Sequence, residues 1–330
     1  MRCMKQNPEM IFVAALIFAG LFFPLAAAGQ SFPTKPITIY CGMEAGATTD
    51  LTARALAEAG QKELKVPVVV ENKPGGGATV AATLLASKKP DGYTLGVIST
   101  TVFNIRHLML RVAYDPFKDF TWVFAYGIYT GGICVRKDSP FKTLQDLLEH
   151  ARKNPGALSY SSSGIGTPQA LSVDYLAKQA KVTIKHVPFK GGASAVTALI
   201  GGHVDFTAGA GIHYTYLKQD VFRMLAVTNS EEREPAFPDV PTLKDLGYKD
   251  VPPPRYQLVA PSGMPDPIFK KVEGAFNKAA HSPEFRKTLD NLGVPFAFKD
   301  WRQMEADFPK TYKFYAELLK EMGIEKEKAK

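Results

Sequence analysis

The stretch YCGMEAGATTDLTARALAEAG, residues Tyr40–Gly60, changes abruptly from a strand pattern to a helix pattern. The ITIYC segment that leads into it alternates apolar and polar residues, which predicts a strand over 37–41. Glycine, alanine and two threonines follow, and apolar residues then recur with helical spacing, which predicts a helix over 49–64. Because the first N–H groups of a helix have no partner within the helix, this arrangement predicts an anion-binding loop.

A carboxylate, Glu44, lies in the middle of this loop, where it would repel an anion. Two interpretations are open. Glu44 pairs with an ammonium group of the ligand or with Arg255, or it points into solvent at the rim of the site. The rim position agrees with the general preference of glutamate for the protein surface.

Strand and helix patterns alternate along the rest of the chain, which predicts an α/β fold with parallel sheets. The length of 330 residues predicts about two domains. The last part of the chain, about 266–325, is predicted to be helical. Strands are predicted at 37–41, 66–72, 93–99, 158–164, 184–189, 203–209 and 222–228, and helices at 49–64, 75–87, 102–110, 138–155, 167–180 and 191–202.

The N-terminus has the pattern of a secretory signal peptide. Basic residues occur within the first ten positions, an uncharged run covers 11–29, and small residues end it at Ala26–Ala28. The run is also long enough for a membrane anchor. Pro24 and the alanines favour cleavage, so we expect residues 1–28 to be removed and the protein to be exported to the periplasm.

Composition excludes several classes of function. The net charge of +8 is not clustered, and the tail KEMGIEKEKAK mixes both signs, which argues against a nucleic-acid partner. The six histidines have no metal-ligand spacing, and no cofactor is expected. The motifs GxSxG, GxGxxG and the P-loop lysine are absent, so we expect no enzyme, with an exported hydrolase as the alternative. Cys41 and Cys134 could pair, but two buried thiols are expected.

Four loops between predicted strands and helices share one composition, rich in Gly, Ser and Thr: Glu44–Asp50, Ser99–Asn104, Ser161–Gln169 and Lys190–Ser194. In α/β sheets such loops gather at the carboxyl ends of the strands, where ligands bind. Thr167 followed by Pro168 fits a helix start, with a hydroxyl cap and a proline that needs no N–H partner. Arg255 and Tyr256 follow the run VPPP, which predicts a crossing between domains whose residues line the cleft.

Ordered segments along 33–324 resemble the Bug-type periplasmic substrate-binding receptors of tripartite tricarboxylate transporters. The resemblance is carried by FPTKPITI, GATTDLTAR, VVVENKPGGGATVAA, KPDGYTLGV, LSYSSSGIGTPQALS, HVPFKGGASAVTALIGGHVDF and LVAPSGMP. It implies a bilobed type II periplasmic binding-protein fold, with two mixed-sheet lobes joined by crossing strands. Lobe one would comprise 32–126 plus 258–330, and lobe two 127–257.

The resemblance also implies a ligand, a partner and a site. The ligand would be a small organic acid or an amino-acid-like solute, held by backbone N–H groups, hydroxyls and water. A monomeric receptor would deliver it to large and small membrane permease subunits, or, as the alternative, present it to a sensor kinase. To Glu44, Arg255 and Tyr256 the resemblance adds Ala45, Gly46, Ala47, Thr48, Thr49, Asp50, Ser99, Thr100, Thr101, Ser163, Gly164, Gly166, Thr167, Lys190, Gly191, Gly192 and Asp205 as ligand-binding residues.

The sequence departs from the family pattern near these loops. Gly42-Met43 replace a Pro-Phe pair, and Arg255 stands where tryptophan is favoured. The proline that usually follows the IN pair is Ile105 here, and Arg106 comes next. We expect Arg255 or Arg106 to meet a second anionic group of the ligand.

Overall fold

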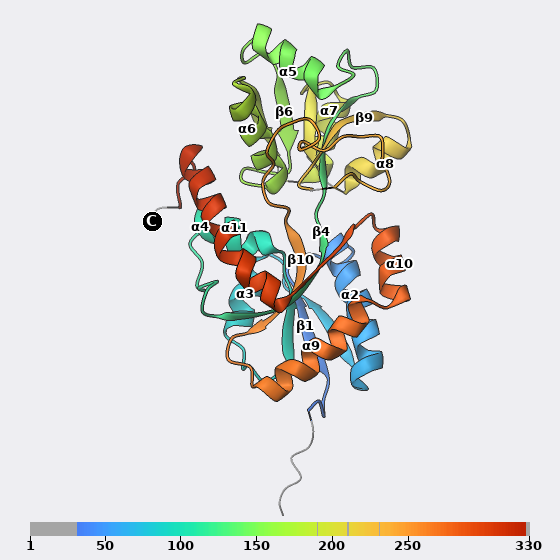
Figure 1. The fold of residues 1–330 in the computed structure, drawn as a ribbon, viewed down its shortest axis with the longest axis vertical. Coiled ribbons are helices and arrows are strands. Elements are labelled where there is room, and N and C mark those ends of the chain that lie inside the picture. The colour runs from blue at the N-terminus through green and yellow to red at the C-terminus, as the bar shows by residue number, and fades with distance from the viewer. Residues whose placement is uncertain (1–31, 190, 210, 231, 328–330) are drawn as a thin grey trace, which may run out of the picture.

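The chain forms two sheets, one in each of two lobes that lie end to end (Figure 1). The computed structural model describes residues 32–189, 191–209, 211–230 and 232–327. The predicted signal peptide lies outside these residues. Within them, no helix is both long and apolar enough to cross a bilayer.

Lobe one contains a six-stranded sheet in the order β11-β4-β10-β3-β1-β2. Its strands are β1 (Ile37–Cys41), β2 (Val68–Asn72), β3 (Thr94–Val97), β4 (Phe120–Ile128), β10 (Arg255–Pro261) and β11 (Phe296–Asp300). Its helices are α2 (Thr48–Leu64), η1 (Gly76–Ala78), α3 (Thr79–Ala86), η2 (Val102–Arg106), α4 (His107–Met109), α9 (Asp266–Ala280), α10 (Pro283–Asn291) and α11 (Trp301–Glu321).

Lobe two contains a five-stranded sheet in the order β7-β6-β8-β5-β9. Its strands are β5 (Gly131–Arg136), β6 (Ser159–Ser162), β7 (Lys185–Pro188), β8 (Phe206–Gly209) and β9 (Phe222–Thr228). Its helices are α5 (Leu144–Lys153), α6 (Pro168–Ala180), α7 (Gly192–Ile200) and α8 (Ile212–Lys218).

Both sheets are mixed, so the prediction of parallel sheets from strand–helix alternation was wrong for part of each. Strand β1 pairs in parallel with β2 and β3, and β6 pairs in parallel with β7 and β8. The strands that lead into or out of a lobe run antiparallel to their neighbours, as β10 does beside β3 and β4, and β5 beside β8 and β9. The mixed sheets implied by the family resemblance are therefore confirmed.

Two segments connect the lobes. Residues 129–130 lead from β4 to β5, and residues 229–254 lead back from β9 to β10. The expected lobe boundaries at 126/127 and 257/258 fall inside β4 and β10, both of which pair within the lobe-one sheet. Where each lobe ends as a folding unit stays a prediction.

Apolar side chains cover both faces of each sheet. In lobe one, α2, α9 and α10 bury residues such as Leu56 and Phe276 on one face, and α3, η2 and α11 bury Phe103 and Phe308 on the other. In lobe two, α5 and α6 cover one face and α7 and α8 the other. Helix α11 continues past its own sheet and ends beside α6 of lobe two, where Leu318 packs with residues of both lobes (Figure 1).

Two predictions about single segments have clear outcomes. The region 266–325 is not helical throughout, because Phe296–Asp300 forms strand β11 at the edge of the sheet and pairs irregularly with β4. Cys41 and Cys134 are both buried and free, one in each sheet, as expected. Burial raises the pKa of both thiols.

Candidate functional site

A pocket of about 190 Å³ lies between the two lobes. Lobe one contributes residues at the end of β3, the start of α2, η1 and η2, and lobe two contributes the start of α6. The lining consists of Gly42, Met43, Thr49, Gly77, Ala78, Val97, Ile98, Ser99, Thr101, Val102, Arg106, Tyr129, Thr167, Pro168, Gln169 and Pro254. The lining thus combines apolar walls with five hydroxyl groups, one amide and one cation, Arg106.

A hydrogen-bond network around Asp50 holds the loop before α2 in place at the edge of this pocket. The carboxylate accepts hydrogen bonds from Gly46 N (2.9 Å), Arg54 Nε (3.0 Å) and Asn72 Nδ2 (2.8 Å). Burial alone would raise the pKa of Asp50, but these hydrogen bonds outweigh it and lower the pKa. Asp50 therefore fixes the loop that precedes α2 and does not line the pocket itself.

Among the described residues, no side chain accepts a hydrogen bond as the N-cap of α2. Its cap position is Ala47, which cannot accept a hydrogen bond through its side chain. The first N–H groups of this 17-residue helix carry a partial positive charge at the pocket edge. Beside them, the hydroxyl groups of Thr49 and Tyr129 lie 2.9 Å apart and join the helix to the crossing segment.

Arg106 is the only charged side chain among the residues lining this pocket. It ends η2, a π-helical turn. Burial lowers the pKa of its guanidinium, and within the described residues no carboxylate compensates the charge. Gly77 lies against it, since a Cβ at that position would come within 2.9 Å of Arg106 Nε. Gly77 also has φ +64°, so both conformation and space favour glycine there.

The wall of lobe two is the start of α6. Thr167 accepts a hydrogen bond from Ala170 N (3.4 Å), and Pro168 occupies the first helical position. This agrees with the predicted cap. Gly166 packs against Met109 of lobe one so closely that a Cβ would come within 2.3 Å of the Met109 sulfur. The two lobes therefore touch beside the pocket.

Three tyrosine rings form the base of the lobe connection. The ring of Tyr129 stacks on that of Tyr256 at 3.6 Å between centroids, and Tyr256 stacks on Tyr126 at 5.8 Å. Tyr256 is only 4% exposed, so it supports Tyr129 from inside lobe one and does not reach the pocket.

Comparison with known proteins identifies the family. The model of the tripartite tricarboxylate transporter family receptor matches residues 52–324. The chain belongs to this receptor family. A relative from Cupriavidus necator, the UPF0065 protein in gbd 5'region, is 36% identical over 313 residues, which are 95% of this chain and 94% of the relative.

Solved structures of other receptors have the same fold. The periplasmic binding protein BugD matches with a TM-score of 0.74 at 29% identity, covering 90% of this chain and 100% of BugD. An R. palustris protein solved with adipate has a TM-score of 0.75 at 26% identity (90% and 100% coverage). MatC from Rhodopseudomonas palustris with bound malate has 0.71 at 27% (87% and 100%). The resemblance to Bug-type receptors and the bilobed fold are confirmed.

Four predicted site residues line the pocket of this receptor: Thr49, Ser99, Thr101 and Thr167. The other predicted residues that the structure describes do not line the pocket. Glu44, Ala45 and Gly46 are exposed on the loop before α2, and Ala47 and Thr48 are half-buried at the helix start. Ser163 and Gly164 precede the cap of α6, with Ser163 exposed. Gly191 and Gly192 begin α7, and Lys190 lies outside the described residues.

Three predicted residues are placed away from the pocket. Asp205 accepts hydrogen bonds from Ser159 N and Oγ at the amino ends of β6 and β8, opposite the carboxyl ends of these strands. The hydroxyl of Thr100 accepts from Arg255 N (2.9 Å), and both residues line a different cavity. The Arg255 guanidinium donates to Ala297 O (3.1 Å) of lobe one. Of the two arginines considered for an anionic group, only Arg106 lines the interlobe pocket.

Several lining residues were absent from the predicted site. Tyr129 could have been found as the first residue after an apolar strand, in a short connection between two such strands. Gly77 belongs to a glycine triplet that matched no phosphate-binding motif. The apolar lining residues Ala78, Val97, Ile98 and Val102 carry no sequence signal that separates them from the core.

Proposed function

We propose that this receptor captures a small organic acid in the interlobe pocket and delivers it to a tripartite membrane permease. One carboxylate would lie at the N-terminus of α2, among the hydroxyl groups of Thr49, Ser99 and Tyr129. A second anionic group would lie against Arg106. Lobe two would complete the site through Thr167 and Gln169.

The uncompensated charge of Arg106 carries this proposal. A partly buried cation without a partner is unfavourable, because the low-dielectric surroundings replace its hydration only in part. An anionic ligand restores the missing partner. The neutral remainder of the lining adds donors and apolar surface but no competing carboxylate.

The relatives support the ligand class. The two solved neighbours with named ligands carry adipate and malate, which both have two carboxylates. An anionic group at the α2 N-terminus and another at Arg106 would match such a ligand at its two ends.

The family also supports the partner and the location. Its members are transporter receptors with a periplasmic binding fold, which favours a permease over a sensor kinase and a binding role over hydrolysis. The proposal takes the receptor as a periplasmic monomer, which light scattering after size-exclusion chromatography tests. Uptake of a labelled acid by cells with and without the receptor and its permease tests delivery.

Calorimetric titration of Arg106→Gln tests the pocket. A thermal-shift screen of organic acids, amino acids and neutral solutes first selects the ligand, because a ligand that binds only the folded state raises Tm. Arg106→Gln is then expected to weaken the selected acid by about 10- to 100-fold, the value of one charge-assisted hydrogen bond. Arg111→Gln, at an exposed arginine outside the pocket, is the matched control.

Two results would contradict the proposal. One is a screen in which neutral or cationic solutes raise Tm and no organic acid does. The other is an acid that binds Arg106→Gln as tightly as the wild type.

A further inference from the structure

Gln169 presents an unpaired amide to the interlobe pocket. It is the second residue of α6, it lines the pocket, and it is only 8% exposed. No hydrogen bond joins its side-chain amide to another group in the part of the chain that the structure describes. A buried amide without a partner is unfavourable, so native structures generally supply one from the protein, from water or from a ligand.

The amide of Gln169 is open to an occupant of the pocket. Among the described residues, the side-chain polar atoms that lack both a partner and contact with solvent belong to Asn104 and Gln257. The Gln169 amide has no partner and is not one of these enclosed groups, so it retains accessible surface. Because Gln169 lines the pocket, a ligand there can reach this surface.

The side chain of Gln169 is held beside the segment that crosses between the lobes. A Cβ at Gly131 would come within 2.8 Å of Gln169 Cγ, so the aliphatic part of the glutamine packs on the backbone of Gly131. Gly131 is the first residue of β5 and directly follows the crossing residues 129–130. Tyr129 of that crossing also lines the pocket. The position of the amide is therefore fixed by contacts within lobe two at the point where the lobes join.

The other lining residues of lobe two have no side-chain donor to offer. Thr167 donates its hydroxyl hydrogen to Gly164 O (3.0 Å) and accepts from Ala170 N (3.4 Å). Pro168 has no polar side chain. The amide of Gln169 carries an acceptor, Oε1, and a donor, Nε2, side by side. Lobe two thus meets the ligand with a paired acceptor and donor that its own residues leave unused.

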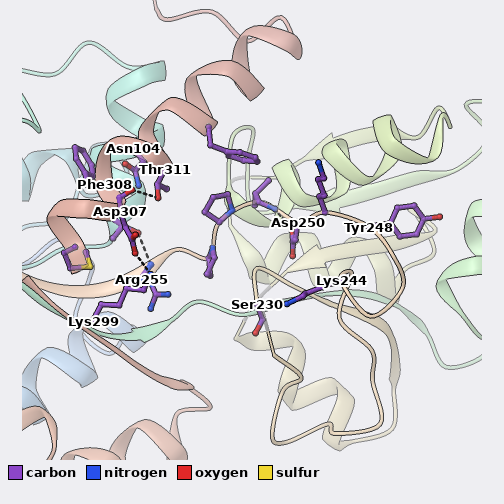
Figure 2. A pocket seen from close by; sticks show the side chains of 17 residues that line it. Asn104, Ser230, Lys244, Tyr248, Asp250, Arg255, Lys299, Asp307, Phe308 and Thr311 are labelled. Atoms are coloured by element: carbon purple, nitrogen blue, oxygen red, sulfur yellow. Dashed lines mark hydrogen bonds and ion pairs between the residues drawn. The ribbon is translucent and has the colours of Figure 1, made fainter. Parts of the chain in front are cut away.

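A second and larger cavity, of about 590 Å³, lies on the other side of the segment 99–106. It lies between α11 and the segment that returns from lobe two, and its lining includes Thr100 and Asn104 (Figure 2). This larger cavity shares no lining residue with the interlobe pocket. Gln169 therefore acts on a ligand of the interlobe pocket and not on an occupant of the larger cavity.

We propose that Gln169 makes the receptor selective for 2-hydroxy acids. A 2-hydroxy acid has a donor, its hydroxyl group, directly beside an acceptor, its carboxylate oxygen. Gln169 Oε1 accepts from the hydroxyl group, and Nε2 donates to the carboxylate, so both atoms of the amide gain a partner. The inference rests on the acid-binding function proposed above, and it narrows the ligand to a 2-hydroxydicarboxylate.

A 2-amino acid or a 2-oxo acid matches the amide less well. An ammonium group also donates to Oε1, but its charge would lie in a pocket whose described lining contains the cation of Arg106 and no carboxylate. A 2-oxo group only accepts, so Oε1 would stay without a partner. A hydroxyl group satisfies the amide without adding positive charge.

Calorimetric titration of the full receptor with succinate and with each enantiomer of malate tests this inference. Glutarate and the enantiomers of 2-hydroxyglutarate repeat the comparison for a longer acid. We expect one hydroxy acid to bind about tenfold more tightly than its unsubstituted partner. Gln169→Met keeps the length of the side chain and its packing on Gly131, and it should abolish this preference. Gln219→Met, at an exposed glutamine of lobe two outside the pocket, is the control and should retain it.

Arg106→Gln distinguishes a failure of this inference from a failure of the proposed function. It should weaken substituted and unsubstituted acids alike, whereas Gln169→Met removes the difference between them. Equal affinity of the wild type for both members of each pair would overturn the role of Gln169 and leave acid binding intact. A preference that persists in Gln169→Met, or tighter binding of aspartate than of malate, would also overturn it. So would the absence of binding by all these acids at millimolar concentration, whereas the proposed function is decided by the wider thermal-shift screen.

Discussion

Arg106 has opposite effects on the stability of the receptor and on the binding that we propose. Its uncompensated charge is unfavourable in the absence of ligand, and a ligand would reverse that effect. A neutral polar side chain in place of Arg106 separates the effect of the charge on stability from its effect on ligand binding. Such a conflict between stability and function is common at binding sites.

The ligand-free Arg106→Gln variant is therefore expected to be more stable than the wild type. The gain should be about 1 kcal/mol, because a partly buried charge is replaced by a neutral amide. Urea unfolding without ligand measures it, with Arg111→Gln as the control. A clear loss of stability in Arg106→Gln would mean that the guanidinium is already compensated in the ligand-free protein.

Glu44 is the residue for which the sequence left two interpretations open. The structure places it exposed on the loop before α2, and it does not line the interlobe pocket. We expect Glu44→Gln to change the affinity for the acid less than twofold, because an exposed charge outside the pocket is screened by solvent. Calorimetric titration of Glu44→Gln with the acid selected by the thermal-shift screen checks this. A tenfold change in affinity in either direction would assign Glu44 a direct role.

Sequence reasoning was most successful where a residue's role follows from a local rule. Thr167 was predicted as a cap from the Thr-Pro pair, and it caps α6. Arg106 was named as one of two arginines that could meet an anion. The choice between them depended on the directions of Arg106, the last side chain of η2, and of Arg255, the first side chain of β10, and no local pattern contains that information.

At the scale of elements, the segment 229–254 shows how a connection is fixed to a lobe. Asp250 anchors it on α6 through Ser172 Oγ, and it also accepts a hydrogen bond from the backbone N–H of Asn229, the first residue after β9. Burial raises the pKa of Asp250 to about 6, although three hydrogen bonds act in the opposite direction. The folded protein thus binds a proton at Asp250 more tightly than the unfolded chain does.

The sign of the pH dependence follows from linkage. Because the folded-state pKa is above the ordinary value, the contribution of Asp250 to stability falls as pH rises from about 4 to about 6, and it stays low above that. In Asp250→Asn this decrease of stability with rising pH is absent. The stability of the variant relative to the wild type should therefore increase over this range by up to about 3 kcal/mol. Urea unfolding at several pH values measures it, and parallel curves would contradict the assignment.

The elements were predictable to different degrees for physical reasons. Strand β1 occupies the predicted range 37–41 because its periodicity is strong. Helix α5 lies within the predicted range 138–155, but it begins only at Leu144, after the cap formed by Thr143. Strand β11 was not predicted, because it is short, half-buried and irregularly paired between two helices. The direction of β10 depends on the chain returning from lobe two, which local patterns do not encode.

For the whole molecule, the contact between α11 and lobe two joins two separate cores. Leu318 and Tyr315 of α11 pack with Leu171 of α6 and with Val251, and the Tyr315 hydroxyl donates to Pro252 O (2.7 Å). Domains that share only a small interface often unfold separately. We expect this cluster to make the two lobes unfold together.

Leu318→Ala is expected to lower the free energy of unfolding by about 2–5 kcal/mol and to divide thermal unfolding into two transitions. Leu56→Ala, inside the core of lobe one, is the control with the same chemistry. It should destabilise the receptor and retain a single transition. Calorimetry distinguishes these results, and a single transition in Leu318→Ala would show that the crossing segments alone couple the lobes.

The π-helical turn at 102–106 has an evolutionary consequence. A π-turn holds one more residue than an α-helical turn, and each residue of an α-helix turns the chain by about 100°. Deletion of one codon in this turn would restore α-helical spacing and rotate the side chains on one side of it by that angle. Arg106 would leave the interlobe pocket, or Asn104 the larger cavity, in a single genetic step. Ligand preference in a lineage of such receptors could thus change by gain or loss of a codon, without any substitution in the loops.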